Sequence, residues 1–266
     1  MISASGRPPI LQTVELSRSF GGFRAVDGVT VSVEQGDIVA LIGPNGAGKT
    51  TLFNLISRLL PPTSGQLLFD GQDVTHTSPQ RLARMGIGRT FQDVRLFDSM
   101  TAWDNVAVFA QSAHSATLRS GLLSPHAVRR EARQVRERVE EVLEYAGLSA
   151  VASTIAGELS FAQQKKVAIA RCLAQRARLM LLDEPASGLD AGEREDVAKM
   201  IEKLAGDGVT IVLVEHNMGI VREVARRAIF LAEGRVVGED TPDRLLKSSE
   251  LAEIYFGHVR SPAGVA

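Results

Sequence analysis

The segment Gly43–Thr50 constrains what this chain can fold into more than any other part of the sequence. Its residues fit the spacing G-x-x-x-x-G-K-[ST] of a phosphate-binding loop. The run Asp37–Ile42, apolar after its first residue, precedes it and has the length of a buried strand. Lys49–Ile56 continues with helical periodicity, and Pro61 and Pro62 then stop the helix. A strand, a glycine-rich loop and a helix therefore follow one another, in the order that such a loop requires.

This loop predicts a bound nucleoside triphosphate. Glycines let backbone N–H groups close around phosphate oxygens, and the start of the following helix adds its positive end. Lys49 would neutralise the β- and γ-phosphates, and Thr50 would ligate Mg²⁺. A plain glycine-rich turn is the alternative, and the flanking strand and helix argue against it. The expected nucleotide contacts are Gly43, Pro44, Asn45, Gly46, Ala47, Gly48, Lys49, Thr50 and Thr51.

A second apolar run, Leu179–Leu182, ends in the carboxylates Asp183 and Glu184. Ligands of parallel α/β sheets bind at the carboxyl ends of the strands, where these two side chains would lie. Asp183 would hold the metal directly or through water, and Glu184 would orient and deprotonate the attacking water. Two acids that cap the following turn are the alternative interpretation.

The order of apolar runs predicts an α/β fold with a parallel sheet covered on both faces. Short β patterns at Ile10–Ser19 and Val29–Glu34 predict a small N-terminal antiparallel sheet, and a last hairpin is expected around Glu233 and Gly234. The stretch from about Val94 to Leu159 is expected to be mostly helical. Its arginines and glutamates alternate between Pro125 and Gly147, which favours a solvated helix with local ion pairs over a nucleic-acid surface.

Composition excludes several classes of protein. Lys and Arg total 30 and Asp and Glu total 31, so a net charge of −1 favours no partnership with nucleic acid. No apolar run approaches the ~18 residues of a membrane span. The N-terminal residues Met1–Pro9 lack the apolar core of a secretory signal. Cys172, the single cysteine, lies in an apolar-periodic segment and is expected to be buried. These features favour a cytoplasmic protein.

The remaining motifs resemble those of the ATP-binding subunits of ABC transporters, from about Leu11 to Tyr255. Leu159–Gln163 looks like the signature motif, and it stands about twenty residues before the carboxylate-tipped strand, as in that family. Gln92 resembles the Q-loop glutamine, and Ser187–Asp190 resembles the D-loop. His216 looks like the H-loop histidine that contacts the γ-phosphate. The aromatic ring that stacks on adenine would be Phe20.

The resemblance implies a P-loop NTPase (RecA-like) fold: a parallel sheet core, an N-terminal antiparallel β-subdomain and an inserted α-helical subdomain. One domain would cover residues 10–256, with the helical subdomain at about 94–160 and a C-terminal tail at 257–266. Catalysis would fall to Glu184, His216 and Gln92, with Gln92 also near Mg²⁺. Ser160 and Gln163 would contact the ATP held by a second ATP-binding subunit, in a homodimer or a paralogous heterodimer.

The resemblance also implies a setting. Such a subunit lies peripherally on the cytoplasmic face of the inner (plasma) membrane, and binds permease subunits near Gln92 and the segment Asp93–Met100. It works indirectly with a periplasmic or extracellular solute-binding protein, and not with nucleic acid. The phrases Phe20–Val26, Gly88–Gln92 and Val214–Met218, and the segment around Gly121–Pro125, resemble the branched-chain amino acid importers. A urea or amide importer and a lipid or lipopolysaccharide exporter are the alternatives. A non-transport ABC ATPase is disfavoured, because it would normally carry a long coiled-coil insert or two tandem P-loop halves, and neither fits in this sequence.

One position departs from the family pattern. Ala162 stands where the usual signature has glycine. Because the motif presents a helix N-terminus and Ser160 to the partner's γ-phosphate, a methyl group here could crowd that phosphate. The sequence therefore suggests slowed hydrolysis or a slightly shifted dimer. The cost depends on the backbone, since replacing Gly by Ala is cheap at negative φ and expensive at positive φ.

Overall fold

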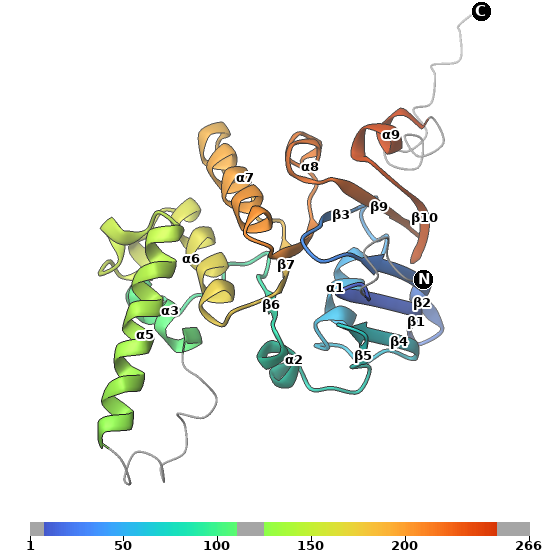
Figure 1. Cartoon of the computed structure of the whole chain (residues 1–266). Coiled ribbons are helices and arrows are strands. Elements are labelled where there is room, and N and C mark those ends of the chain that lie inside the picture. The colour runs from blue at the N-terminus through green and yellow to red at the C-terminus, as the bar shows by residue number, and fades with distance from the viewer. Residues whose placement is uncertain (1–7, 111–124, 249–266) are drawn as a thin grey trace, which may run out of the picture.

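A six-stranded sheet forms the centre of the protein, whose computed structural model describes residues 8–110 and 125–248 (Figure 1). The strand order is β10-β9-β3-β8-β7-β6. Strands β9, β3, β8, β7 and β6 run parallel, and β10 is antiparallel to β9. The predicted parallel sheet is confirmed. Its strands are β3 (Ile38–Ile42), β6 (Ile87–Arg89), β7 (Leu179–Asp183), β8 (Thr210–Val214), β9 (Arg227–Ala232) and β10 (Arg235–Asp240).

A four-stranded antiparallel sheet of order β2-β1-β4-β5 lies beside the first. The sequence predicted the antiparallel pair β1 and β2, and missed β4 and β5. In β4 a glycine and a glutamine precede a short apolar run, so the strand pattern is weak. The strands are β1 (Leu11–Phe20), β2 (Phe23–Val33), β4 (Ser64–Phe69) and β5 (Gln72–Asp73).

Strands β3, β7, β8 and β9 of the central sheet are buried on both faces, as their continuous apolar sequences require, whereas β10 is an exposed edge strand. In β3, Ile38, Ala40 and Ile42 join one core cluster, whereas Val39 and Leu41 join the other. This alternation follows from the two-residue period of a strand. One cluster lies on the side of α6, α7 and α8, and the other lies between the two sheets around α1. The helices of these layers are α1 (Lys49–Ile56), α2 (Pro79–Met85), α6 (Phe161–Ala174), α7 (Ala191–Gly206), α8 (Met218–Val224) and α9 (Pro242–Lys247).

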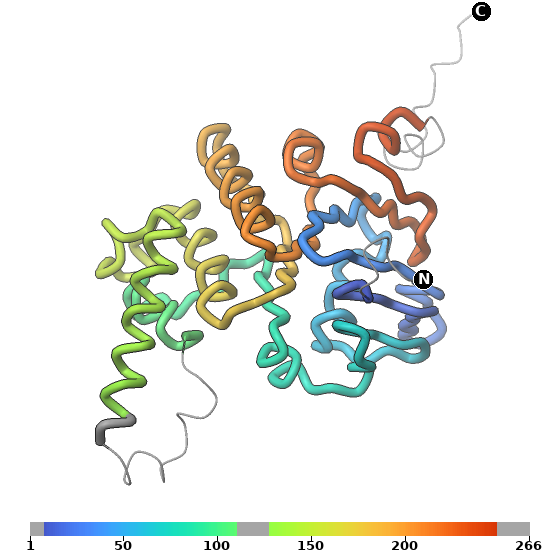
Figure 2. Tube along the Cα trace, in the orientation of Figure 1, coloured from blue at the N-terminus to red at the C-terminus, as the bar shows by residue number. Residues whose placement is uncertain are grey.

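The helical stretch that the sequence predicted lies on the left of Figures 1 and 2, away from the antiparallel sheet. It holds α3 (Ala102–Ala110), α5 (Pro125–Tyr145) and two short 3₁₀ turns, η1 (Ser149–Val151) and η2 (Ala156–Glu158). Ion pairs join Arg133 to Glu137 and Arg138 to Glu141 along α5, so the expected solvated helix is confirmed. The segment 121–124 and the tail 257–266 lie outside the described residues.

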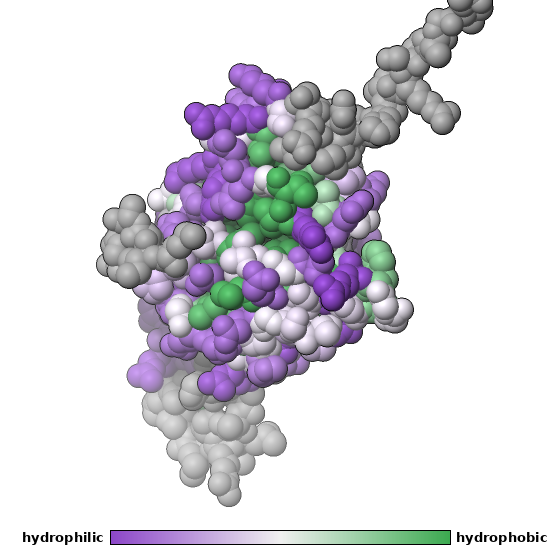
Figure 3. Space-filling view, turned by 90° about the vertical axis from the view of Figure 1, so that its right-hand side faces the viewer, coloured by the Kyte–Doolittle hydropathy of each residue, from purple (hydrophilic) through white to green (hydrophobic). Residues whose placement is uncertain are grey.

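The predicted hairpin around Glu233 and Gly234 is present, but it does not stand alone. Its first strand, β9, extends the central sheet by pairing with β3. In the described part of the chain, no helix combines the length and the apolar character that a membrane span requires. Figure 3, which looks at the right-hand side of Figure 1, shows hydrophilic side chains around an apolar region near the centre of that face.

Candidate functional site

The loop Gly43–Thr50 connects β3 to α1, as predicted, and close packing explains two of its glycines. Gly43 has φ 144°, and a Cβ there would lie 2.0 Å from the carbonyl oxygen of Leu231. Gly48 has φ 99°, and a Cβ there would lie 2.3 Å from the carbonyl oxygen of Ala25. A side chain at either position would collide with a neighbouring backbone. The loop is therefore shaped by β2 and β9 as well as by its own sequence.

The turn between β9 and β10 braces the same loop. The N–H of Gly234 donates to the carbonyl oxygen of Ala47 at 3.0 Å, and the N–H of Asp27 donates to that of Gly234 at 2.9 Å. Arg235 holds the Asp27 carboxylate at 2.6 Å, and hydrogen bonds from Arg235 and Arg24 lower the pKa of that carboxyl. Two other parts of the chain, β2 and the β9–β10 turn, thus fix the loop. Its outer residues, Asn45, Gly46 and Thr50, are left exposed.

Lys49 is buried, and its ammonium turns back into the loop. Nζ donates to the carbonyl oxygens of Gly43 at 2.7 Å and Pro44 at 2.8 Å. Burial lowers the pKa of Lys49, and the negative charge of Glu184 opposes that shift. A cation thus lies inside the loop, where the negative charge of Glu184 acts on it.

Asp183 ends β7 and is nearly inaccessible. Burial raises the pKa of this carboxyl, and the adjacent Arg89 opposes that shift. Arg89 Nη2 lies 3.4 Å from Asp183 Oδ2. Arg89 also donates to Asn54 Oδ1 at 2.8 Å and to Ser57 Oγ at 2.7 Å, so it links β6 and α1 to β7. The buried charge that the sequence placed at this strand end therefore has a protein partner.

The three residues expected to act in catalysis come together. Glu184 Oε1 lies 3.1 Å from His216 Nε2, and Glu184 Oε2 accepts a hydrogen bond from Gln92 Nε2 at 3.1 Å. They come from the end of β7, the end of β8 and the segment after β6. Because parallel strands end at the same edge of a sheet, residues far apart in the sequence meet there. Glu184 has φ 48°, a left-handed conformation that residues other than glycine rarely adopt.

Three charged residues around this group were missed by the sequence analysis: Arg89, Lys165 and Glu215. Glu215 is 2% exposed, and its carboxylate accepts hydrogen bonds from the N–H groups of Ala186, His216 and Asn217. Burial raises its pKa, and these hydrogen bonds oppose the shift. Glu215 thus joins the turn after β7 to the turn that carries His216. Its position directly after an apolar strand, like that of Asp183, was the available signal.

The remaining predicted site residues lie elsewhere. Ser160 and Gln163 form a reciprocal cap at the start of α6: Gln163 N–H donates to Ser160 Oγ at 3.3 Å, and Ser160 N–H donates to Gln163 Oε1 at 3.0 Å. Phe20 ends β1, and 45% of it is exposed. Figure 1 places α6 and β1 in opposite halves of the molecule. Among the described residues, Ser160, Gln163 and Phe20 make no hydrogen bond to Glu184.

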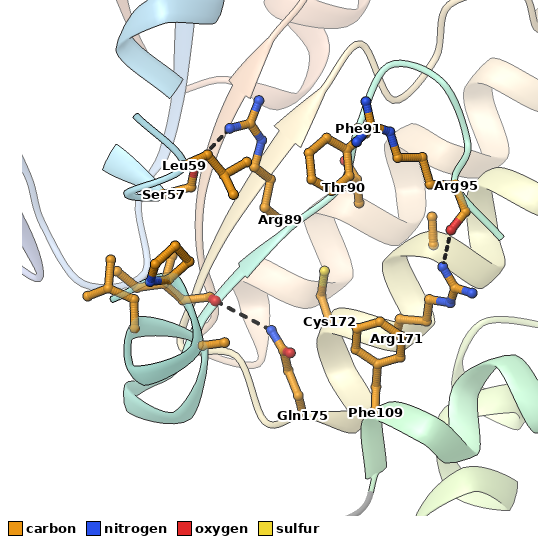
Figure 4. A pocket seen from close by; sticks show the side chains of 15 residues that line it. Ser57, Leu59, Arg89, Thr90, Phe91, Arg95, Phe109, Arg171, Cys172 and Gln175 are labelled. Carbon is orange, nitrogen blue, oxygen red and sulfur yellow. Dashed lines mark hydrogen bonds between the residues drawn. The ribbon is translucent and has the colours of Figure 1, made fainter. Parts of the chain in front are cut away.

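A cavity of about 240 Å³ opens beside the segment that carries Gln92. Its wall includes Phe91, Arg95, Phe109 and Arg171 (Figure 4). The Arg171 guanidinium donates to the carbonyl oxygen of Arg95 at 2.5 Å and lies about 5 Å from the rings of Phe97 and Phe109. Burial lowers the pKa of Arg171 to about 10. α6 is thereby joined to the segment that follows Gln92.

The comparisons with known proteins agree with this geometry. The sequence profile described as "ABC transporter" matches residues 26–187, which span the phosphate loop, the Gln92 segment and both carboxylates of β7. The chain belongs to the ABC transporter family. It is an ATPase subunit of that family, it binds ATP, and its fold is that of a P-loop NTPase.

Relatives cover almost the whole chain. It is 39% identical to the branched-chain amino acid transport ATP-binding protein BraF of Pseudomonas aeruginosa, over 94% of this chain and 98% of that one. It is 36% identical to LivG of Escherichia coli K12, with the same coverage, and 35% identical to the glutamine transport protein GlnQ of that bacterium. Among solved structures, a nucleotide-free ABC transporter cassette matches with a TM-score of 0.81 at 31% identity, covering 93% of this chain and 99% of that one. A dimeric cassette bound to ADP and phosphate matches with a TM-score of 0.73 at 28% identity, covering 87% and 98%.

Proposed function

We propose that this ABC ATPase binds ATP with the phosphates in the loop Gly43–Thr50 and the adenine on Phe20. The loop's N–H groups and the Lys49 ammonium neutralise the triphosphate, and Thr51 extends the same helix start. The exposed ring of Phe20 offers the flat apolar surface that base stacking needs. Mg²⁺ suits the oxygen donors of Thr50, Asp183 and Gln92, because it prefers hydroxyl, carboxylate and carbonyl ligands. The ion supplies charge neutralisation at the phosphates.

Hydrolysis relies on Glu184. Its carboxylate lies between His216 and Gln92, at 3.1 Å from each, so two neighbours orient it. Glu184 accepts a proton from water as the water attacks the γ-phosphate, and His216 stabilises the developing negative charge. Gln92 orients the water. These roles follow from the distances together with the family's motif order.

A complete site requires two subunits. Ser160 and Gln163 lie at the start of α6, in the other half of the molecule from Phe20 (Figure 1). One nucleotide therefore does not reach both ends within one chain. A second ATP-binding subunit, a copy of this chain or a paralogue, places its own α6 against the γ-phosphate. ATP thus holds two chains together, and hydrolysis releases them, as in a ligand-driven two-state switch.

The partners of this dimer are membrane permeases. The cavity beside Gln92 lies between the core and the helical region, and its rings and guanidinium groups suit a docking helix. Permease movement would then reach Gln92 through the segment Asp93–Met100. Docking there would hold the subunit peripherally at the cytoplasmic face of the inner membrane. The docked unit would be one domain at residues 10–256, with a helical subdomain at about 94–160.

Import of branched-chain or other hydrophobic amino acids is the function best supported. The observation that carries it is the near-complete coverage by BraF and LivG, both named for branched-chain amino acid transport. A periplasmic or extracellular solute-binding protein would deliver the cargo. GlnQ is nearly as similar and is named for glutamine transport. The comparisons therefore support amino acids as the transported class more broadly than they support a branched-chain or other hydrophobic side chain in that cargo. A urea or amide importer and a lipid exporter are the alternatives.

The replacement Glu184→Gln tests the catalytic assignment. It keeps the size and one acceptor of the side chain but removes the base, so turnover should fall ~10²–10⁴-fold while ATP still binds. Glu202→Gln, at an exposed position of α7, is the matched control and should hydrolyse ATP normally. Steady-state ATPase rates and binding of a fluorescent ATP analogue measure the two properties. Turnover near the wild-type rate in Glu184→Gln would show that Glu184 is not the base.

The cargo is tested in the intact transporter. Membrane complexes are isolated through a tag on this chain, and the ligand of the associated solute-binding protein is identified by mass spectrometry. Proteoliposomes should then take up labelled leucine, with competition by isoleucine and valine. Selective uptake of glutamine or urea, or ATPase stimulation by lipid alone, would overturn the assignment to hydrophobic amino acids.

A further inference from the structure

Lys165 is a buried cation that no part of the proposed mechanism uses. It lies in the second turn of α6 and is 5% exposed. Its Nζ donates a hydrogen bond of 2.6 Å to the main-chain carbonyl oxygen of Glu184. α6 also begins with Ser160, which is proposed to contact the nucleotide held by the partner subunit. One helix therefore carries both the cap that faces the partner and a direct contact to this chain's own base.

The charges around Lys165 explain why a buried ammonium is tolerated. Asp183, Glu184 and Glu215 all attract it, and these attractions oppose the lowering of its pKa by burial. A buried charge without such partners is expensive, because water no longer solvates it. The cation is thus matched to the carboxylates at the ends of β7 and β8.

The contact acts on the backbone that aims Glu184. At φ 48° this residue adopts a left-handed conformation, which costs free energy outside glycine. Its N–H donates to the carbonyl oxygen of Val214 at 2.9 Å, and its own carbonyl oxygen accepts from Ser187 N–H at 3.3 Å as well as from Lys165. Because the backbone dihedrals set the direction of Cβ, the groups that fix this carbonyl also fix where the carboxylate points.

A second contact joins the same turn of α6 to the chain beyond Glu184. The Phe161 ring packs on Gly188, where an added Cβ would lie 2.9 Å from Phe161 Cε1. Lys165 Nζ lies 5.1 Å from the centre of that ring, one helical turn away. The first turns of α6 therefore hold the segment from Glu184 to Gly188 at two points.

We infer that Lys165 is a positioning residue that couples the placement of α6 to the orientation of Glu184. Displacement of α6 by the partner's nucleotide moves the Lys165 ammonium, and with it the Glu184 carbonyl and carboxylate. The inference rests on the proposed role of Glu184 as the base. It extends that role, because it links the signature end of one composite site to the base of the other.

Three replacements in the full chain test this coupling. Lys165→Met keeps the length and the apolar stem but removes the donor and the charge, and Lys165→Arg restores both. Lys166→Met is the matched control, since its ammonium pairs with Asp196 on α7 rather than with Glu184. We expect kcat of Lys165→Met to fall about 10-fold to 100-fold, the worth of one hydrogen bond from a charged donor. KM for ATP and binding of a fluorescent ATP analogue should change less than about 2-fold, because the phosphate loop is untouched.

The pattern across variants separates positioning from stability. Lys165→Arg should recover most of kcat, and Lys166→Met should retain it. If Lys165→Met unfolds below the assay temperature, Lys165→Gln, which keeps a neutral donor, is measured instead and should show a smaller loss of kcat at unchanged KM. The inference is overturned if kcat stays within about 2-fold in Lys165→Met, if Lys165→Arg is equally impaired, or if ATP binding is lost together with kcat. When Glu184→Gln stops turnover but Lys165→Met does not, the coupling alone fails and the proposed base stands.

Discussion

Replacement of Ala162 by glycine tests how the departure from the usual signature motif is accommodated. The sequence alone suggested that this methyl group could crowd the partner's phosphate. In the structure Ala162 is the second residue of α6, and its φ is not positive. Its side chain is only 6% exposed and belongs to the core cluster on the side of α6, α7 and α8. Its side chain therefore packs inward, and the helical backbone accepts alanine without strain. We expect Ala162→Gly to destabilise the protein and to leave hydrolysis unchanged.

The magnitude follows from two contributions. Glycine in place of alanine costs up to ~1 kcal/mol through backbone freedom, and less in the first turn than in a helix interior. Loss of a buried methyl group adds ~0.8 kcal/mol. The sum is ~1–2 kcal/mol, equivalent to a fall in the melting temperature of a few degrees for a chain of this size.

Ala191→Gly is the control that separates the backbone contribution from the loss of the buried methyl group. Ala191 opens α7, which begins with a capping box like that of α6, but it is exposed. It should lose only the backbone contribution. Denaturant unfolding of the two variants should differ by ~0.8 kcal/mol, and the ATPase rate of Ala162→Gly in the assembled complex should stay within about 2-fold of wild type. Equal destabilisation by the two replacements, or a several-fold faster ATPase in Ala162→Gly, would refute the inward packing and restore the crowding hypothesis.

Two further outcomes are expected. Burial raises the pKa of the Cys172 thiol to about 12, so little thiolate forms at pH 8; a thiol reagent should label the native chain far more slowly than the denaturant-unfolded one, and equal rates would contradict the buried position. Gly43→Ala would place a Cβ 2.0 Å from the Leu231 carbonyl oxygen at φ 144°, so binding of a fluorescent ATP analogue should weaken at least ~10-fold, whereas normal affinity would show that the loop relaxes freely.

The local features of the site could be predicted because each is written in one short segment. The phosphate loop lies between β3 and α1 as expected, since a strand, glycines and a helical pattern are contiguous in the sequence. Asp183 ends β7 and Glu184 directly follows it, for the same reason. Gln92 and His216 were assigned from the family resemblance alone, and their proximity to Glu184 is explained by the structure, in which parallel strands present their carboxyl ends at one edge.

Contacts between segments escaped prediction. Lys165 and Arg89 have no local pattern that marks a buried cation, and each becomes notable only because its partner lies on another element: the Glu184 carbonyl for Lys165, the Asp183 carboxylate for Arg89. The β9–β10 hairpin was expected, but its support of the phosphate loop through Gly234 depends on the pairing of β9 with β3. Such pairings are set by the packing of the whole sheet.

The buried cations of α6 explain how one helix could serve several parts of the transporter. Lys165 contacts the backbone of Glu184, and Arg171 contacts the carbonyl oxygen of Arg95, in the segment after Gln92. The two are six residues apart on one helix, ~9 Å along its axis. Their contacts connect the proposed base and the proposed permease-docking segment to the same helix. A shift of α6 that turns Glu184 would therefore also displace Arg171 in the wall of the cavity beside Gln92, so the proposed coupling would link the ATP site to the proposed docking site.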